Sequence, residues 1–276
     1  MAEDGQGEIA RHFLLDGKVG ICQSAGGEHR AGLDAVMLAA AVSLDPRPGR
    51  DVATLVDLGA GVGAGGLCVA ARLAGTGIKQ ALHVTLVDND PASLALARLS
   101  VSEPANAPFA SRIDILDADV TLRGAARTAA GLRPNMADWV IMNPPFHDRA
   151  KVRHSPNRSR AAAHVLGEDG LLPWFRTAAA ILKKDGRLGL IFPAEGLNRV
   201  LEGLHGRFGA VAVFPLFKGA EEPAIRVVVT ATKASRRPLR LLPGLVLHEK
   251  ARNAGGRRDW TAPANAVLKG NASLFI

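Results

Sequence analysis

From residue 54 onward, short apolar runs rich in Val, Leu and Ile alternate with longer alanine-rich stretches. The short runs predict buried strands and the longer stretches predict helices. The expected strands cover residues 54–58, 83–87, 112–116, 139–142, 187–192, 210–214 and 225–232, and the expected helices cover 64–73, 92–101, 171–182 and 195–205. Alternation of this kind is typical of an α/β protein, with a mostly parallel sheet covered by helices on both faces.

The two ends of the chain depart from this alternation. Residues 1–31 are polar and rich in glycine, with a small edge strand expected at 19–21, and residues 32–42 predict a mostly apolar helix. Near the other end, the apolar runs at 239–242 and 245–248 flank a Pro-Gly pair, which predicts a hairpin. We therefore expect three parts: an N-terminal extension with a leading helix (1–48), a core (49–235), and a C-terminal hairpin with a basic tail packed on the core (236–276).

Composition narrows the functional class. Among the 276 residues no apolar run reaches transmembrane length, and the polar, acidic start of the chain is unlike a signal peptide, so a cytoplasmic protein is expected. Cys22 and Cys68 have no Cys or His partner at ligand spacing, which argues against a metal centre or a disulfide framework. The net charge of +8 favours a polyanionic partner such as RNA, although arginine usage in a GC-rich genome would produce the same charge.

A glycine-rich turn follows the strand at 54–58, in the run Asp57-Leu58-Gly59-Ala60-Gly61-Val62-Gly63. Glycines at such a turn let the backbone approach a ligand closely. Asp88, at the end of the next strand, suits a ribose, because a carboxylate accepts hydrogen bonds from both hydroxyls. A nicotinamide-binding unit would show the same two features. Asp57 argues differently, since a carboxylate there would repel a pyrophosphate but attract the cationic amino-acid end of S-adenosylmethionine.

The strand at 139–142 ends in Asn143-Pro144-Pro145-Phe146. Two consecutive prolines cannot continue a ladder of hydrogen bonds, so the strand stops on a stiff, extended turn. The turn presents the Asn143 side chain and the Pro144 carbonyl as acceptors, with the Phe146 ring beside them. Two acceptors and a ring suit a planar conjugated NH2 group, because acceptors placed for the tetrahedral amine free its lone pair. Taken alone, Asn-Pro-Pro is also an ordinary loop signal.

Together these motifs resemble a class I S-adenosylmethionine-dependent methyltransferase, in particular the bacterial tRNA(Val) adenine N6-methyltransferases and their relatives labelled predicted O-methyltransferases. The resemblance includes Asp117-Ala118-Asp119 and extends from Gly32-Leu33-Asp34 to the run at 245–249. It implies a seven-stranded sheet whose last strand is inserted antiparallel.

The resemblance also implies roles for individual residues. The glycine turn wraps the methionine part of the cofactor, Ala118 and Asp119 flank its adenine, Asp34 lies near the cofactor or the acceptor base, and the Asn143 turn holds the acceptor amine. The implied cofactor-binding residues are Asp34, Asp57, Gly59, Ala60, Gly61, Gly63, Asp88, Asn89, Ala118, Asp119 and Asn143, and the implied catalytic residues are Asn143, Pro144 and Phe146.

Two features bear on the acceptor. A basic segment follows the turn, and we expect Pro145, Arg149, Lys151, Arg153 and Arg158 to contact RNA, although a solvated charged loop would show the same pattern. The family typically has aromatic residues before the leading helix, in a Gly-Tyr-Lys/Arg-Phe-Gly-Thr-Asp run, whereas residues 28–34 read Glu-His-Arg-Ala-Gly-Leu-Asp here. This departure leaves methyl transfer intact and the acceptor open.

The leading hypothesis is methyl transfer from S-adenosylmethionine to an exocyclic base nitrogen, foremost adenine N6 in tRNA. Guanine N2 in rRNA, a glutamine amide in a protein and a small-molecule hydroxyl remain alternative acceptors. A non-catalytic RNA-binding protein and a nicotinamide-dependent oxidoreductase are alternatives from other classes. The sequence leaves open a monomer or a homodimer, and whether His147 assists proton loss.

Overall fold

The computed structural model describes residues 8–25, 32–44, 52–74, 81–145, 147–148, 165–166, 170–250 and 258–274. Its main sheet contains nine strands: β3 (Val52–Leu58), β4 (Ala81–Asp88), β5 (Ile113–Asp117), β6 (Ala137–Met142), β9 (Leu182–Pro193), β10 (Phe208–Phe217), β11 (Ala224–Lys233), β12 (Arg240–Leu241) and β13 (Leu245–Val246). Its helices are α1 (Leu33–Ala40), α2 (Ala64–Ala74), α3 (Pro91–Val101), α4 (Gly124–Ala129), α6 (Leu172–Ile181), α7 (Leu197–Leu204) and α8 (Ala262–Leu268).

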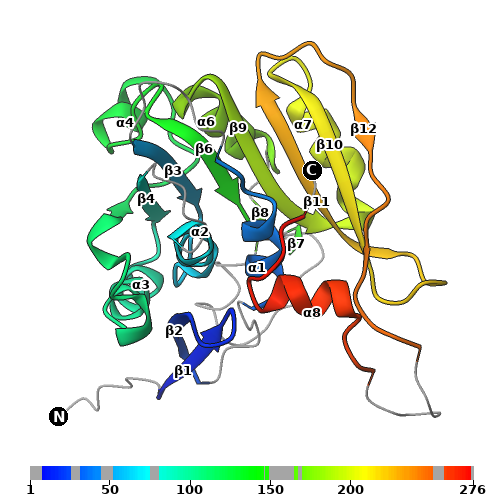
Figure 1. Ribbon diagram of the computed structural model, residues 1–276. Coiled ribbons are helices and arrows are strands. Elements are labelled where there is room, and N and C mark those ends of the chain that lie inside the picture. The colour runs from blue at the N-terminus through cyan, green and yellow to red at the C-terminus, as the bar shows by residue number, and fades with distance from the viewer. Residues whose placement is uncertain are drawn as a thin grey trace.

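Seven longer strands make up most of this sheet, in the order β5-β4-β3-β6-β9-β11-β10 (Figure 1). The strands from β5 to β9 run parallel, and β11 lies antiparallel between β9 and β10. The expected α/β class and the antiparallel insertion of the last long strand are therefore confirmed. None of the helices in the described ranges is long and apolar enough to cross a membrane.

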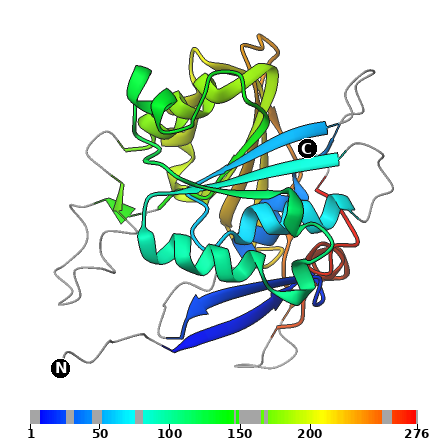
Figure 2. The same ribbon diagram turned by 90° about the vertical axis from the view of Figure 1, so that its left-hand side faces the viewer.

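Successive side chains along the strands point to opposite faces of the sheet and pack into two separate cores. Leu55 and Ile141 belong to one core, with residues of α1 and α2, whereas Val56 and Val140 belong to the other, with residues of α6 and α7. Both faces of the sheet are thus buried, which explains why these strands read as continuous apolar runs. Figure 2 shows the sheet nearly edge-on, with helices on either side.

The N-terminal part is a hairpin rather than a single edge strand. Strand β1 (Ile9–Leu14) pairs antiparallel with β2 (Val19–Ser24), which contains the expected strand at 19–21. The fully buried Asn106 holds this hairpin against the end of α3, because its side chain accepts a hydrogen bond from the Gly20 amide and donates one to the Gly20 carbonyl. A further strand pair joins β7 (His147–Asp148) to β8 (Val165–Leu166).

The expected C-terminal hairpin is wrong. Strands β12 and β13 do not pair with each other; each pairs parallel with β10, with Ala212 opposite Arg240 and Leu216 opposite Leu245. The chain therefore continues along the sheet edge through Pro243-Gly244 instead of reversing. Pro215 of β10 has no N–H to donate at this point, and Gly244 (φ +83°) lies so close to the Pro215 carbonyl that a Cβ would clash. The Pro-Gly pair marks an irregularity between two short strands, and α8 follows, packed against α1.

Candidate functional site

The sheet register aligns the ends of four parallel strands. Met142 of β6 pairs with Leu58 of β3, Leu58 pairs with Val87 of β4, and Asp88 pairs with Asp117 of β5. The residues that follow each strand, including Asn143 and Gly59, therefore start from one row at the carboxyl edge. Neighbouring strands lie about 4.8 Å apart, so the row spans roughly 14 Å. Ligands of open α/β sheets bind at this edge.

Asp57 lies beneath the first turn of α2. Its side chain is 3% exposed, and its Oδ2 accepts a hydrogen bond of 2.7 Å from the Gly66 amide. Burial raises the pKa of Asp57 to about 7, the bond from Gly66 lowers it, and the nearby charge of Asp88 raises it further. The carboxylate thus caps the helix in this structure, and its cost of burial makes it a strong attractor for a cation.

Asp88 ties two turns together through its carboxylate. Oδ2 accepts a hydrogen bond of 2.8 Å from the Gly61 amide, and Oδ1 accepts bonds from the amides of Asn89 (2.9 Å) and Asp90 (3.0 Å). A carboxylate has about four acceptor positions, so three amides leave about one. A ribose whose two hydroxyls both bind Asp88 would therefore have to displace one of these amides. Of the three, only the Gly61 amide belongs to the glycine turn.

The glycine turn is shaped by its conformation and by one aromatic neighbour. Gly59 and Gly61 have φ of +66° and +55°, where residues with a side chain are strained. A Cβ on Gly59 would lie 2.5 Å from the indole of Trp174 on α6, so this ring covers the turn. The sequence did not single out Trp174, because it sits within an apolar helical pattern that explains it fully as a packing residue.

The structure places Asn143 directly after β6, with an exposed side chain, while Pro144 is buried and Pro145 half-buried. The strand does stop at Asn143, as the two prolines require. An exposed amide on a buried, proline-stiffened support is held in place without being enclosed. It therefore presents a hydrogen-bonding group to a ligand above the carboxyl edge.

Asp34 lies at the same edge, in the first turn of α1. Its Oδ2 is 3.1 Å from Nε of Arg226 on β11, and both side chains are largely covered. Arg226 pairs with Pro193, three residues beyond the partner of Met142, so the ion pair lies level with the turn after Asn143. Sequence reasoning missed Arg226, whose only signal is a charge within the apolar run at 225–232.

The remaining predicted cofactor residues also follow strand ends. Ala60 lies in the glycine turn, where its amide donates to the Val87 carbonyl, and Gly63 donates to the Ala60 carbonyl. Ala118 is buried, and its amide donates to the Asp88 carbonyl. Asp119 is half-buried and accepts a hydrogen bond of 2.7 Å from the Thr121 amide, so it also stabilises its own turn.

Several predicted residues lie outside the described part of the chain: Phe146, Arg149, Lys151, Arg153 and Arg158. Their proposed roles rest on the sequence. Among the described residues, no group of three or more His, Cys, Asp or Glu side chains could hold a metal ion.

The site fits S-adenosylmethionine on three observations. The buried Asp57 carboxylate suits a cationic ammonium, a Cβ would clash at Gly59 and at Gly63 of the glycine turn, and Asp88 ends the strand beside it. The turn would surround the methionine part, Asp88 would face the ribose, and Ala118 with Asp119 would flank the base. When bound, this cofactor supplies an electrophilic methyl group.

Comparisons with known proteins agree with this geometry. Residues 39–215 match the family described as the methyltransferase small domain. The fold resembles that of a predicted O-methyltransferase from Agrobacterium tumefaciens, with a TM-score of 0.70 and 34% identity, covering 87% of this chain and 98% of that one. No curated protein matches the chain.

A second solved structure resembles this chain in fold alone. It is a T. thermophilus 16S rRNA N2 G1207 methyltransferase in complex with AdoMet and guanosine, with a TM-score of 0.50 and 15% identity, and it covers 88% of this chain and 48% of that one. The family match spans well over half of the chain, and its range contains the glycine turn, Asp88 and Asn143. This chain therefore belongs to the methyltransferase small domain family of class I methyltransferases, and its cofactor is S-adenosylmethionine.

Proposed function

We propose that this methyltransferase acts on an exocyclic amino nitrogen of a nucleobase, foremost adenine N6 in tRNA. The observation that carries the proposal is the exposed Asn143 amide, which follows β6 level with Gly59 and Asp88. The cofactor and the acceptor group would thus meet along one row of strand ends. The resemblance to tRNA(Val) adenine N6-methyltransferases and the net charge of +8 support RNA as the acceptor.

The chemistry follows from the turn. The Asn143 side-chain oxygen and the Pro144 carbonyl would accept hydrogen bonds from the two amine hydrogens, and Phe146 would stack on the base. As the nitrogen becomes tetrahedral, its lone pair leaves the ring and becomes available for the methyl group. Acceptors placed for that geometry stabilise the transition state more than the planar base. The methylated nitrogen is acidic, so its proton leaves to water without a dedicated base.

The Asn143 turn suits amino acceptors better than hydroxyl acceptors. Guanine N2 and a glutamine amide also offer a conjugated NH2, and they would use the same two acceptors. The Agrobacterium relative is described as a predicted O-methyltransferase, which suggests a hydroxyl acceptor for that protein, and a hydroxyl has a proton that must be removed. The exposed group at the turn is an amide, which accepts hydrogen bonds but is too weakly basic to take that proton. Amino nitrogen is therefore the better match.

The test is methylation of fractionated tRNA, rRNA and protein with labelled S-adenosylmethionine, followed by nucleoside analysis. Labelled N6-methyladenosine from tRNA is the expected product, whereas label confined to protein or to a small molecule would refute the nucleobase assignment. Asn143→Ala should lower kcat on the order of 10²–10³-fold and leave cofactor affinity near that of the parent, because its acceptor acts on the reacting amine. Asn198→Ala, at an exposed asparagine of α7, is the matched control and should have parent-like turnover.

A further inference from the structure

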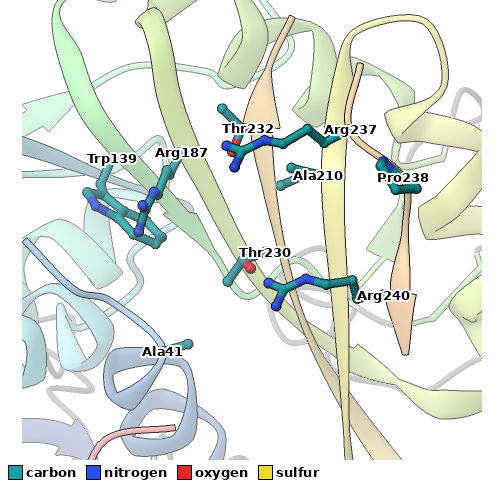
Figure 3. A pocket seen from close by; sticks show the side chains of 10 residues that line it. Ala41, Trp139, Arg187, Ala210, Thr230, Thr232, Arg237, Pro238 and Arg240 are labelled. Carbon is teal, nitrogen blue, oxygen red and sulfur yellow. The ribbon is translucent and has the colours of Figure 1, made fainter. Parts of the chain in front are cut away.

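A pocket of about 440 Å³ lies on the same sheet but away from the carboxyl edge. Its polar lining consists of Trp139, Arg187, Thr230, Thr232, Arg237 and Arg240, and the rest is small or apolar (Figure 3). Trp139 lies four residues before Asn143 on the same chain segment, so the pocket sits about 13 Å back along the strands, at 3.3 Å per residue. It is a second site, separate from the one described above.

The ladder register brings residues of five strands together at this pocket. Trp139, Arg187 and Thr232 form one row across β6, β9 and β11, and Thr230 and Arg240 are joined in a second row through Ala212 of β10. Paired residues project from the same face of a sheet, so all of these side chains point to one side. That side is the face that α1 packs against, and Ala41, which follows the end of α1 at Ala40, also lines the pocket.

One wall of the pocket is held rigidly. The Trp139 indole donates a hydrogen bond of 2.9 Å to the Ser43 carbonyl, and the Arg187 guanidinium lies 5.6 Å from the centre of the indole ring. Arg187 also donates to the Ser43 hydroxyl at 3.2 Å. The opposite wall carries Arg237 and Arg240, whose exposed side chains reach toward the two threonines in Figure 3.

The charge in this pocket is unbalanced. Three guanidinium groups and two hydroxyls line it, and no lining residue is acidic. Within the described ranges, neither Arg237 nor Arg240 forms an ion pair. Guanidinium groups bind phosphate in a bidentate manner, and threonine hydroxyls supply further donors. Donors from both walls outnumber the acceptor positions of one carboxylate, so a phosphate group, with more oxygens, fits them better.

We propose that this pocket binds a phosphate group, supplied by the backbone of the RNA substrate at a nucleotide outside the methyl-transfer site. The RNA source rests on the proposed function above, whereas the phosphate chemistry rests on the pocket alone. Phosphate contacts of this kind fix the register of a nucleic acid on a protein without reading its bases. The pocket would orient the RNA so that the target base reaches the Asn143 turn. A free phosphorylated small molecule is the other source of the same group.

The test is the double variant Arg237→Gln/Arg240→Gln, which removes two charges and keeps both side chains polar. Binding of a 20-nucleotide single-stranded RNA is measured by fluorescence anisotropy between 50 and 300 mM salt, with S-adenosylhomocysteine present to fill the cofactor site. Loss of one phosphate contact should lower the slope of log K against log salt by about 0.7, and it should weaken binding at 0.1 M salt about 5-fold. Arg98→Gln/Arg133→Gln removes two exposed arginines elsewhere and should change the slope little.

Calorimetry with inorganic pyrophosphate separates the two sources. If the pocket variant loses RNA binding relative to the control variant, the RNA backbone is the source. If it loses pyrophosphate binding alone, the pocket takes a free phosphorylated molecule, which refutes the RNA source and supports the phosphate chemistry. If it binds both probes like the control variant, the proposal is wrong. These assays measure binding and do not depend on methyl transfer. They therefore test the pocket even if the parent protein methylates no RNA.

Discussion

The buried carboxyl of Asp57 should make the stability of the cofactor-free protein depend on pH. Its side chain is 3% exposed, and burial raises its pKa from 3.8 to about 7. A difference of about three units between the folded and unfolded states corresponds to about 4 kcal/mol. Asp57→Asn removes the titration, and the amide oxygen can still accept the hydrogen bond from the Gly66 amide.

The sign follows from which state loses its proton first. Below about pH 4 both states hold the proton on Asp57, so this group contributes no penalty. Between about pH 4 and pH 7 the unfolded state ionises while the folded state keeps the proton, so the free energy of unfolding falls by up to about 4 kcal/mol. Above the folded pKa of about 7 the penalty is constant. The side-chain amide introduced by Asp57→Asn does not titrate. The free energy of unfolding of the variant should therefore rise relative to that of the parent as the pH rises across this window.

Urea unfolding followed by tryptophan fluorescence and circular dichroism, from pH 4.5 to pH 8, measures this difference. Other titrating groups are shared by both proteins, so subtracting the two curves isolates Asp57. Asp117→Asn, which removes an exposed carboxylate at the end of β5, controls for the loss of one charge. The free energy of unfolding of the variant minus that of the parent should change with pH over this range. If this difference changes by less than about 1 kcal/mol, burial of the Asp57 carboxyl does not destabilise the folded state as expected. Saturating cofactor should reduce the pH dependence, since its ammonium group favours the ionised carboxylate.

Two further predictions concern the cofactor turn. Asp88→Ala removes the acceptor of the Gly61, Asn89 and Asp90 amides as well as the proposed ribose contact, so calorimetry should show cofactor affinity reduced at least tenfold. Parent-like affinity would refute the ribose role. Gly59→Ala and Gly61→Ala both place a side chain at positive φ, at about 1–2 kcal/mol each, but only the first meets Trp174, at 2.5 Å. Gly59→Ala should therefore lower Tm several degrees more than Gly61→Ala, and equal shifts would contradict the packing described here.

The sequence by itself determined the class of fold and predicted most of the proposed cofactor site. Strands buried on both faces must be apolar throughout, so β3, β4, β6 and β9 were visible as runs, and the two prolines after Asn143 dictated where β6 stops. Glycines at positive φ and a carboxylate at a strand end are local requirements, which a local pattern can reveal. Asp57, Gly59, Gly61 and Asp88 were predicted as cofactor-binding residues for that reason.

Tertiary structure alone decided the contacts between segments far apart in the chain. Trp174 covers Gly59 and Arg226 pairs with Asp34, yet each reads in sequence as a packing residue or a stray charge. The C-terminal strands failed as a hairpin because Pro-Gly permits both a reversal and an irregular continuation, and the free edge of β10 beside Pro215 selected the second. The arginine pocket is the strongest case, since Arg187 and Arg240 meet only through the register of β9, β11, β10 and β12. Register is a property of the assembled sheet, and no single segment of the chain carries it.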